Sequence, residues 1–314
     1  MNRPHKLAGA EIICREIVSD ISFQLDKAGL LYRIFSRVKA LDSIGEKFIR
    51  KKSEGESYSN GGKMLQDFIG IRVTSYFHDD IHPIMELIKS LSKYKIVDEK
   101  IDLHSSSEFK PKRTNIVCKM SESQKEDFSF IIRSLGSEYE GKIDSTFEIQ
   151  LRTIISEGWH EIDHNLRYKC KEDWISHLES DRMLNGIYAS LETNEVALKE
   201  MFERLAYNHY KEKNWDALLR TKFRLRLQLD SISNELKAIL DADNELGKKI
   251  LKAERAELIK TFIKLTDSVP VTMDNIIYII NLLGSGNEKI LYLTPKTISQ
   301  DDIFKKTNEQ KLAV

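Results

Sequence analysis

Residues 145–152, STFEIQLR, alternate apolar and polar side chains with a period of two. This period is typical of a β-strand, in which successive side chains point to opposite faces of the sheet. Three apolar side chains share one face and suit a hydrophobic core, namely Phe147, Ile149 and Leu151. Glu148, Gln150 and Arg152 share the other face, where they place a carboxylate, an amide and a guanidinium in a row. The pattern alone leaves a solvated face and a functional face equally open.

A second predicted strand lies within residues 67–77, DFIGIRVTSYF, which are rich in β-branched and aromatic side chains. Asp67 stands at the strand entrance, and Arg72 lies inside an otherwise apolar run. A guanidinium in such a run needs an acidic partner or an anionic ligand. If the two strands are neighbours, Asp67 and Glu148 could hold Mg²⁺, because this hard cation takes carboxylate oxygens and usually adds phosphate oxygens and water. The structural alternative is that Asp67 caps the strand and Arg72 pairs with an acid.

Residues 34–52, IFSRVKALDSIGEKFIRKK, have apolar side chains at three- and four-residue spacing, which predicts a helix. The segment is also strongly basic, with cations at Arg37, Lys39, Lys47, Arg50, Lys51 and Lys52. Arg37 and Lys39 would diverge around a helix, but they could converge on one phosphate group if the helix began only at about Lys39. A solvated basic face is the structural alternative for such a run of charges.

The other predicted elements alternate between helix and strand up to about residue 170. Helices are predicted over 10–30, 79–94 and 154–169, and strands near 96–102 and 114–120. Residues 124–136 fit either element. Beyond residue 175 the pattern is almost entirely helical, apart from a period-two alternation over 222–229 that stays open. We therefore predict an α+β protein, with a mixed sheet flanked by helices in residues 1–175 and a mainly helical region in residues 176–314.

The bulk composition restricts the partners and the compartment. The chain has 49 basic and 49 acidic residues, so its formal net charge of zero gives no global attraction to nucleic acid or to an acidic membrane. The three cysteines lie far apart and fit no CxxC pattern, which argues against a disulfide framework or a cysteine zinc site. No apolar run approaches the roughly 18–20 residues of a membrane span. We expect a cytoplasmic protein.

The chain offers two candidate metal carboxylates and several cations, and it has no Ser or Cys nucleophile signature. This set suits phosphoryl transfer, in which positioning and charge neutralisation contribute most of the catalysis. The chain has no GxxxxGKS/T sequence, so a P-loop enzyme is excluded by its main motif.

Four blocks resemble the RelA/SpoT-type alarmone synthetases in order and spacing, over roughly residues 30–170. The blocks are Ser36–Lys39 with Asp42–Ile44 and Lys47, Asp67–Val73, Phe147–Thr153, and Trp159, His164, Tyr168 and Lys169.

The resemblance implies a nucleotidyltransferase-like synthetase domain. Such a domain transfers the β,γ-pyrophosphate of ATP to the 3′-hydroxyl of a guanine nucleotide, which is alarmone synthesis. The resemblance assigns the ATP phosphates to Arg37, Lys39, Lys47 and Arg72. It assigns Mg²⁺ to Asp67, and it gives Glu148 either a share of the metal or the proton of the attacking hydroxyl. It assigns the acceptor, GTP or GDP, to Gln150, Arg152, His164 and Lys169. Asp67, Arg72 and Glu148 would form the catalytic set.

One segment departs from the family pattern. The family carries a GYRSLH-like loop whose tyrosine stacks on the acceptor guanine. Residues 105–120, SSSEFKPKRTNIVCKM, have neither that glycine nor that tyrosine. Phe109 would be the replacement platform, and Lys110, Lys112 and Arg113 could still meet acceptor phosphates. The resemblance therefore supports use of ATP more strongly than use of guanine. Toxin-type relatives that modify adenosine nucleotides or tRNA 3′ ends are one alternative, and a non-catalytic nucleotide sensor is another.

A rival motif lies at His160–His164, whose sequence HEIDH matches the HExxH signature of zinc peptidases. Two histidines four residues apart on a helix could bind Zn²⁺ while Glu161 acts as a general base. The synthetase-like blocks already account for His164, so a zinc hydrolase is the less favoured hypothesis.

The helical region after residue 175 offers two further features. Apolar stripes predict core or packing faces, with members at Met183, Leu184, Ile187, Leu191, Leu198, Met201, Phe202 and Leu205. Basic side chains between residues 211 and 226 surround Trp215 and Phe223, a mixture that can bind RNA, although a plain helical surface is the simpler interpretation. Possible partners of this region are tRNA, a regulatory protein or a second copy of the chain.

Overall fold

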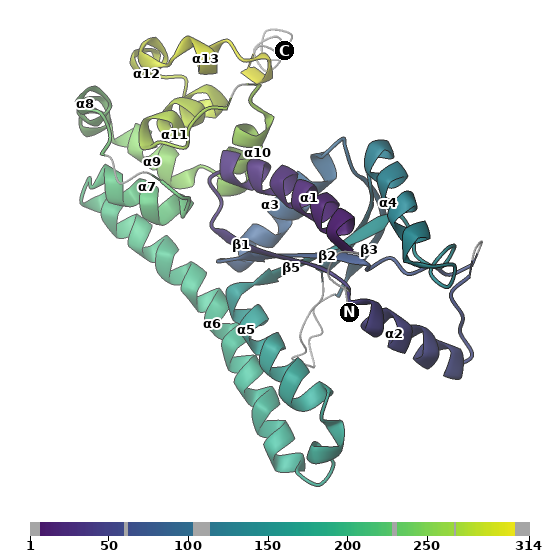
Figure 1. Cartoon of the computed structure of the whole chain (residues 1–314). Coiled ribbons are helices and arrows are strands. Elements are labelled where there is room, and N and C mark those ends of the chain that lie inside the picture. The colour runs from purple at the N-terminus through teal and green to yellow at the C-terminus, as the bar shows by residue number, and fades with distance from the viewer. Residues whose placement is uncertain (1–6, 60–61, 103–113, 228–230, 267, 305–314) are drawn as a thin grey trace. The chain divides into compact units, whose positions relative to one another are not determined.

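The computed structural model describes residues 7–59, 62–102, 114–227, 231–266 and 268–304 (Figure 1). The chain divides into two compact units that are interleaved along the sequence. The first comprises Met1–Ser22, Tyr32–Tyr76 and Ile88–Leu191, and the second comprises Phe23–Leu31, Phe77–Leu87 and Glu192–Val314. The division into residues 1–175 and 176–314 stays a prediction. Within the described residues, no helix is both long and apolar enough to cross a membrane.

The first unit is built on a mixed five-stranded sheet, with strand order β1-β2-β5-β4-β3. The strands are β1 Tyr32–Val38, β2 Ile69–Ser75, β3 Lys95–Ile101, β4 Thr114–Lys119 and β5 Thr146–Thr153. β2 and β5 run parallel, and every other neighbouring pair is antiparallel. The predicted strands over 68–77 and 145–152 are thus confirmed, and they are neighbours at the centre of the sheet. The predicted mixed sheet flanked by helices is confirmed as well.

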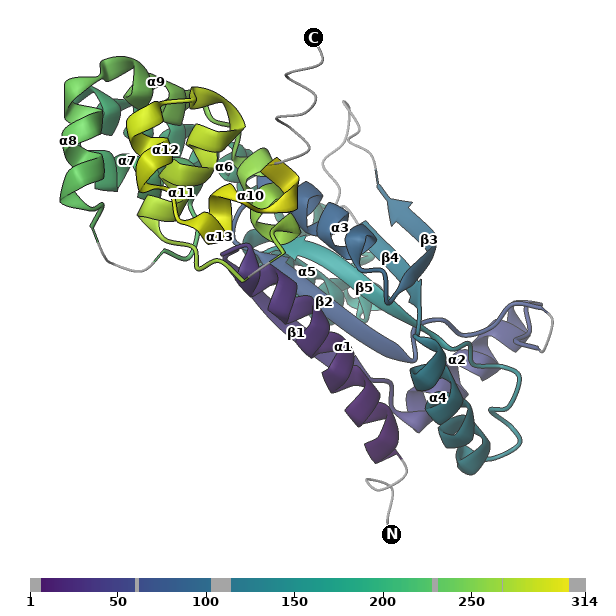
Figure 2. The same cartoon turned by 90° about the horizontal axis from the view of Figure 1, so that it is seen from above.

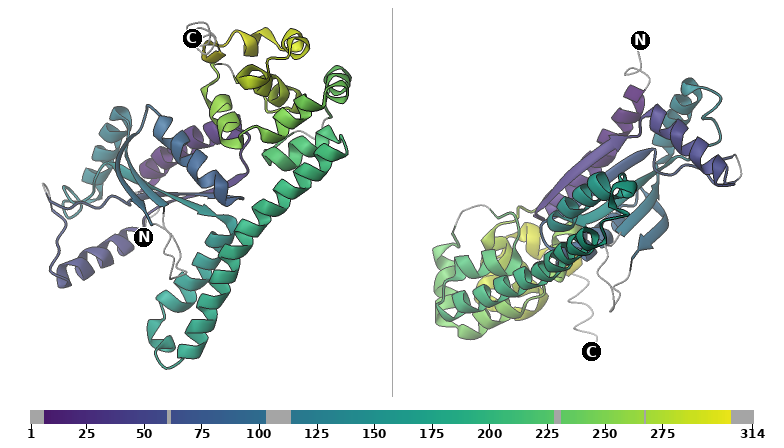
Figure 3. Two further views of the ribbon diagram at one scale, coloured as in Figure 1. Left: turned by 180° about the vertical axis from the view of Figure 1, so that it is seen from behind. Right: turned by 90° about the horizontal axis from the view of Figure 1, so that it is seen from below.

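Helices cover the apolar face of this sheet. α1 (Ala8–Lys27) and α4 (Glu122–Leu135) lie on this side (Figures 1 and 2). Phe128 of α4 packs edge-on against Phe68, with 5.5 Å between ring centroids, and both rings are fully buried. On the opposite face, α5 (Ile154–Asp163) follows β5 directly (Figure 3). The sheet therefore uses its apolar side chains for the core and turns its polar row toward α5.

The helix predicted over residues 34–52 is wrong in its first part. Residues 32–38 form strand β1, which pairs along its whole length with β2, and the helix α2 occupies Leu41–Ser53. Ile34 and Val38 are four residues apart, a spacing that satisfies both one helical turn and one face of a strand. The ladder offered by β2 decides between them. The helix N-terminus has no side-chain cap at Ala40, so the boundary carries no sequence signal.

The ambiguous segment 124–136 is helical. Ser121 and Gln124 form a reciprocal capping box at the start of α4, which satisfies two backbone N–H groups that a helix end leaves unpaired. The predicted helix over 79–94 is a short 3₁₀ turn, His78–Asp80, followed by α3, Ile81–Ser90. The predicted helix over 154–169 is α5, continued by a π-helical turn at His164–Tyr168.

The C-terminal region is mainly helical, as predicted. After a short 3₁₀ turn at Lys171–Trp174 come α6 Leu178–Lys211, α7 Trp215–Phe223, α8 Asn234–Ala242, α9 Asn244–Lys252, α10 Arg255–Lys264, α11 Met273–Ile280, a π-helical turn Asn281–Ser285, α12 Glu288–Leu293 and α13 Lys296–Ser299. The period-two alternation begins inside α7 and continues in irregular backbone to residue 227. It is therefore not a strand in the part of the chain that is described.

Two expectations for this region need correction. Met183, Ile187 and Met201 were expected to lie on core or packing faces, yet they are 70%, 49% and 49% exposed, so these members of the stripe lie on the surface of α6. Trp215 and Phe223 were named as possible RNA contacts, with a plain helical surface as the simpler interpretation, yet both are buried and belong to the core of the second unit. A buried ring cannot stack on a base, so the mixture of basic and aromatic side chains does not form an RNA surface.

Candidate active site

The polar row of the sheet runs across three strands. In the strand register, Arg37 of β1 pairs with Gly70 of β2, and Gly70 pairs with Glu148 of β5. Directly paired residues project to the same face of a sheet, so the row presents a guanidinium, a bare glycine and a carboxylate. A Cβ built at Gly70 would meet one neighbouring atom, Cγ of Arg37 at 3.9 Å. The glycine leaves open space between the two charged side chains.

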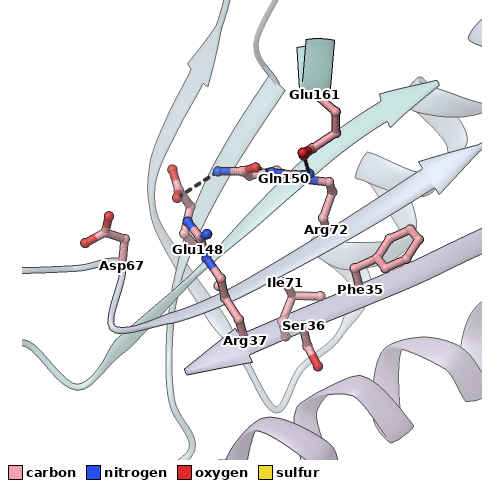
Figure 4. A pocket seen from close by; sticks show the side chains of 10 residues that line it. Phe35, Ser36, Arg37, Asp67, Ile71, Arg72, Glu148, Gln150 and Glu161 are labelled. Atoms are coloured by element: carbon pink, nitrogen blue, oxygen red, sulfur yellow. Dashed lines mark hydrogen bonds and ion pairs between the residues drawn. The ribbon is translucent and has the colours of Figure 1, made fainter. Parts of the chain in front are cut away.

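A second row lies two residues further along the same strands. Phe35 of β1 pairs with Arg72 of β2, and Arg72 pairs with Gln150 of β5. The Nε atom of Arg72 donates a hydrogen bond of 3.2 Å to Oε1 of Gln150. The two rows enclose a cavity of about 190 Å³ (Figure 4). Its lining residues are Phe35, Ser36, Arg37, Asp67, Gly70, Ile71, Arg72, Glu148, Gln150 and Glu161.

Asp67 lies just before β2 and binds both predicted lysines. Nζ of Lys39 is 2.6 Å from Oδ2 of Asp67, and Nζ of Lys47 is 3.0 Å from both carboxylate oxygens. Burial would raise the pKa of Asp67, but the hydrogen bond and charge of Lys39, together with Lys47, lower it below its usual value. Burial lowers the pKa of Lys39 despite the neighbouring carboxylate. The structure thus brings Lys39, Lys47 and Asp67 together as an ionised cluster at the edge of the cavity.

Two side-chain amides hold the carboxylate of Glu148. Nδ2 of Asn115 donates to Oε1 at 2.7 Å, and Nε2 of Gln150 donates to Oε2 at 3.2 Å. Asn115 is on β4 and pairs in register with Gln150. Both donors fix the direction of the carboxylate. Asn115 was not predicted from the sequence, because its role depends on the pairing of β4 with β5.

Two acids of α5 neutralise Arg72. Its Nη1 atom donates to Oε1 of Glu157 and, at 2.8 Å, to Oε1 of Glu161. These glutamates are four residues apart and share one face of the helix. Glu157 was not predicted from the sequence, and Glu161 was considered only within HExxH. The sequence offers the residue types, an arginine inside an apolar strand and two acids one turn apart on a helix, but not their contact.

The residues predicted to bind the acceptor divide into two groups. Gln150 lines the cavity. Arg152 is only 8% exposed, and its Nε atom lies 3.5 Å from Oε2 of Glu157. The ring of His164 stacks on His160 and Tyr168, and Lys169 donates to Asn165 at 2.9 Å. Arg152, His164 and Lys169 are not among the lining residues. Lys112, with Phe109, Lys110 and Arg113, lies outside the described residues.

The HExxH segment does not present a zinc site in the described structure. Burial, with the charges of Arg152 and Arg72, lowers the pKa of His160 to about 4. Glu161 is engaged by Arg72, as described above. Across the described ranges, no group of three or more His, Cys, Asp or Glu side chains is arranged to hold a metal ion. A structural or hydrolytic zinc centre requires at least three protein ligands, so this arrangement does not support the zinc hydrolase hypothesis.

The carboxylates of Asp67 and Glu148 fit a different kind of metal. Both are among the residues that line the same cavity (Figure 4). Mg²⁺ is commonly bound by one or two carboxylates, with phosphate oxygens of the substrate and water completing its shell. The donor set therefore suits a magnesium ion that arrives with a polyphosphate, and does not need an all-protein cage.

Comparison with known proteins finds one family and several relatives. A family described as "Region found in RelA / SpoT proteins" matches residues 36–173. The GTP pyrophosphokinase YjbM of Bacillus subtilis (strain 168) is 24% identical over 165 residues, covering 49% of this chain and 70% of that protein. The GTP pyrophosphokinase YwaC of the same organism is 23% identical over 138 residues, covering 44% of this chain and 59% of that protein.

Two solved structures resemble this chain at low similarity. The small alarmone synthetase 1 from Bacillus subtilis is 20% identical, with a TM-score of 0.42, and the match covers 60% of this chain and 92% of that one. The protein smu.1046c from Streptococcus mutans UA159 is 20% identical, with a TM-score of 0.47, and the match covers 64% and 94%. The family match contains Arg37, Asp67, Arg72 and Glu148, which the fold gathers around one cavity. Residues 36–173 of this chain match the region found in RelA / SpoT proteins.

Proposed function

We propose that this chain is an ATP-dependent pyrophosphokinase that transfers the β,γ-pyrophosphate of ATP to the 3′-hydroxyl of a guanine nucleotide, which makes an alarmone. The family region and the two relatives named GTP pyrophosphokinase support this class of reaction. One observation about the molecule carries the proposal. Arg37, Arg72, Asp67 and Glu148 line a single cavity, in which Gly70 leaves open space beside Arg37.

The proposed reaction forms one bond and breaks one bond. The 3′-hydroxyl oxygen of the acceptor attacks the β-phosphorus of ATP, and the bond from that phosphorus to the α,β-bridging oxygen breaks, releasing AMP. Arg37 and Arg72 would bind the phosphate oxygens and offset their negative charge. Glu148 would take the proton of the attacking hydroxyl, or would share the metal. Asn115 and Gln150 hold its carboxylate in a fixed direction, which suits either role.

Asp67 and its lysines have a related role in the proposal. A magnesium ion held by Asp67, with or without Glu148, would supply charge neutralisation for the phosphates. Lys39 and Lys47 keep Asp67 ionised and place two ammonium groups at the edge of the cavity. These ammonium groups would bind ATP phosphates when a cation takes their place on the carboxylate. Arg152, His164 and Lys169 remain proposed acceptor-side residues, and Lys112 is proposed with them.

The acceptor is the part of the reaction for which the sequence departs from the family pattern. The names of the relatives favour a guanine nucleotide. Residues 105–120 lack the glycine and tyrosine of the family's acceptor loop. That departure keeps two other acceptors in the test, an adenosine nucleotide and the 3′ end of tRNA.

The test supplies the purified chain with ATP labelled in the γ-phosphate and with GTP, GDP, excess ATP or tRNA in separate reactions with Mg²⁺. We expect label on GTP or GDP and one AMP for each product. Label only on tRNA or only on adenosine nucleotide would replace the proposed acceptor. If the chain binds ATP but transfers label to none of these acceptors, the non-catalytic nucleotide sensor would replace the proposed enzyme.

A matched pair of variants tests the role of Glu148. We expect Glu148→Gln to lower turnover by about 10²-fold or more, the usual scale for losing a general base. Glu122→Gln, on an acid of α4 that is 87% exposed, makes the same chemical change away from the cavity and should leave turnover unchanged. Full activity of Glu148→Gln would remove the assigned role.

A further inference from the structure

Arg72 already has acidic partners in the cavity where the proposed function places a polyphosphate. Two carboxylates bind the same nitrogen, Nη1, and the contact with Glu161 is 2.8 Å long. A phosphate oxygen would use the same donor, because a guanidinium binds carboxylates and phosphates through the same N–H groups. Any phosphate that binds Nη1 must therefore compete with an acid of this chain.

The two acids have different surroundings. Glu157 is 13% exposed, and its second oxygen lies 3.5 Å from Nε of the buried Arg152, so this carboxylate stands between two arginines. Glu161 is 53% exposed and lines the cavity. Its second oxygen accepts a hydrogen bond of 3.2 Å from the exposed side chain of Asn165. Glu157 is a fixed anchor for Arg72, whereas Glu161 can turn into solvent at little cost.

The charge of Glu161 is also unfavourable for the proposed ligand. Its carboxylate shares the cavity with Asp67 and Glu148, and a triphosphate would bring several more negative charges to the same space (Figure 4). Asp67 and Glu148 have a use as metal ligands or as a base. Glu161 has neither use in the proposed reaction, and it occupies a cation that the reaction needs.

We propose that Glu161 is a carboxylate gate on the phosphate subsite, an inference that rests on the proposed function. In the nucleotide-free site it neutralises Arg72, and it must leave Nη1 before a phosphate binds there. The residue thereby weakens polyphosphate binding and is a specificity-determining residue, whereas Glu157 positions Arg72. This role also accounts for the glutamate of the HExxH segment.

The test measures binding of inorganic tripolyphosphate to the full chain by titration calorimetry at low ionic strength. We expect Glu161→Gln to bind tripolyphosphate about three- to tenfold more tightly than the wild type, since an exposed ion pair is lost and a like charge is removed. Glu122→Gln removes the same charge from the surface of α4 and should bind as the wild type does. A merely structural role for Glu161 would give weaker binding or none, so equal or weaker binding by Glu161→Gln overturns the proposal.

A second ligand and a second variant keep the result interpretable. Adenosine carries no phosphate, so Glu161→Gln should not change its affinity; a parallel gain for adenosine would contradict a gate on phosphate. Glu161→Ala should show the same gain for tripolyphosphate, and a thermal melt checks that both variants are folded. Tighter binding by Glu161→Gln without ATP turnover in the wild type would uphold the gate and overturn the proposed function. ATP turnover by the wild type, together with unchanged tripolyphosphate binding by Glu161→Gln, would uphold the proposed function and overturn the gate. If neither protein bound tripolyphosphate, both proposals would be overturned.

Discussion

The Glu157 carboxylate should be the most important acid for the stability of the first unit. Glu157→Gln keeps the size of the side chain and removes its charge. One carboxylate oxygen accepts from Nη1 of Arg72, and the other lies 3.5 Å from Nε of Arg152. Arg152 is 8% exposed and Glu157 is 13% exposed, so little water is available to replace the lost charge. The substitution would leave the buried guanidinium of Arg152 without an acid on this side.

The expected loss follows from this burial. Removing one partner of a fully buried ion pair costs about 3–5 kcal/mol, because the other charge stays behind uncompensated. Exposed pairs contribute about 0.2–1 kcal/mol. The pair here lies near the buried limit, but the amide oxygen of the introduced glutamine could still accept one hydrogen bond, so we expect a loss of about 2–3 kcal/mol. Glu161→Gln changes the same functional group one helical turn away on a side chain that is 53% exposed, and should cost less than about 1 kcal/mol.

Urea unfolding followed by circular dichroism, with the midpoint and slope fitted for each variant, measures the difference. Arg152→Met and the double variant with Glu157→Gln complete a double-mutant cycle, in which a coupling of about 1 kcal/mol or more is expected for groups in contact. If Glu157→Gln were as stable as Glu161→Gln, or if the cycle showed no coupling, the assignment of Glu157 as a buried anchor would be refuted.

Two further predictions concern the cavity and its acid. Gly70→Ala should keep the thermal midpoint of the wild type, because the nearest atom to the new methyl group is Cγ of Arg37 at 3.9 Å. The methyl group should narrow the cavity and so lower ATP affinity in a calorimetric titration. A large drop in the thermal midpoint would contradict this prediction. The lowered pKa of Asp67 means that its ion pairs stabilise the fold above its unfolded pKa of about 3.9 and that this contribution is lost as the pH falls through the folded value. Asp67→Asn should therefore flatten the acid side of a plot of unfolding free energy against pH, and an unchanged slope below about pH 5 would contradict this.

Local patterns were sufficient for the central strands, for the helical spans near residues 10–30, 79–94 and 154–169, and for the helical character of the C-terminal region. Residues 145–152 alternate so regularly that one face must be buried and the other polar, and residues 67–77 are too apolar and β-branched for a surface element. Asp67, Arg72 and Glu148 could be identified as candidate site residues from those strands. The first part of 34–52 could not be assigned to an element, because Ile34 and Val38 fit a helix and a strand equally well.

Partners on other elements were not predictable in the same way. Asn115 orients Glu148 because β4 pairs with β5 in one register, and Glu157 and Glu161 neutralise Arg72 because α5 lies across the polar face of the sheet. Spacing along the chain contains no information on such distances. The exposure of Met183 and Ile187 on α6 has the same cause, since a helical stripe specifies a face but not what packs against it.

The sequence by itself determined the kind of chemistry in this protein. Its strands repeat every two residues, so their polar faces, and the side chains on them, follow from the order of residues alone. Only the tertiary structure decided which of those charged side chains are available to bind a ligand. Arg37 lines an open cavity beside a glycine, whereas Arg72 is held by two acids and Arg152 is buried, although all three are arginines on the same sheet. Electrostatic interactions depend on distance and on exclusion of water, and both are properties of the folded chain.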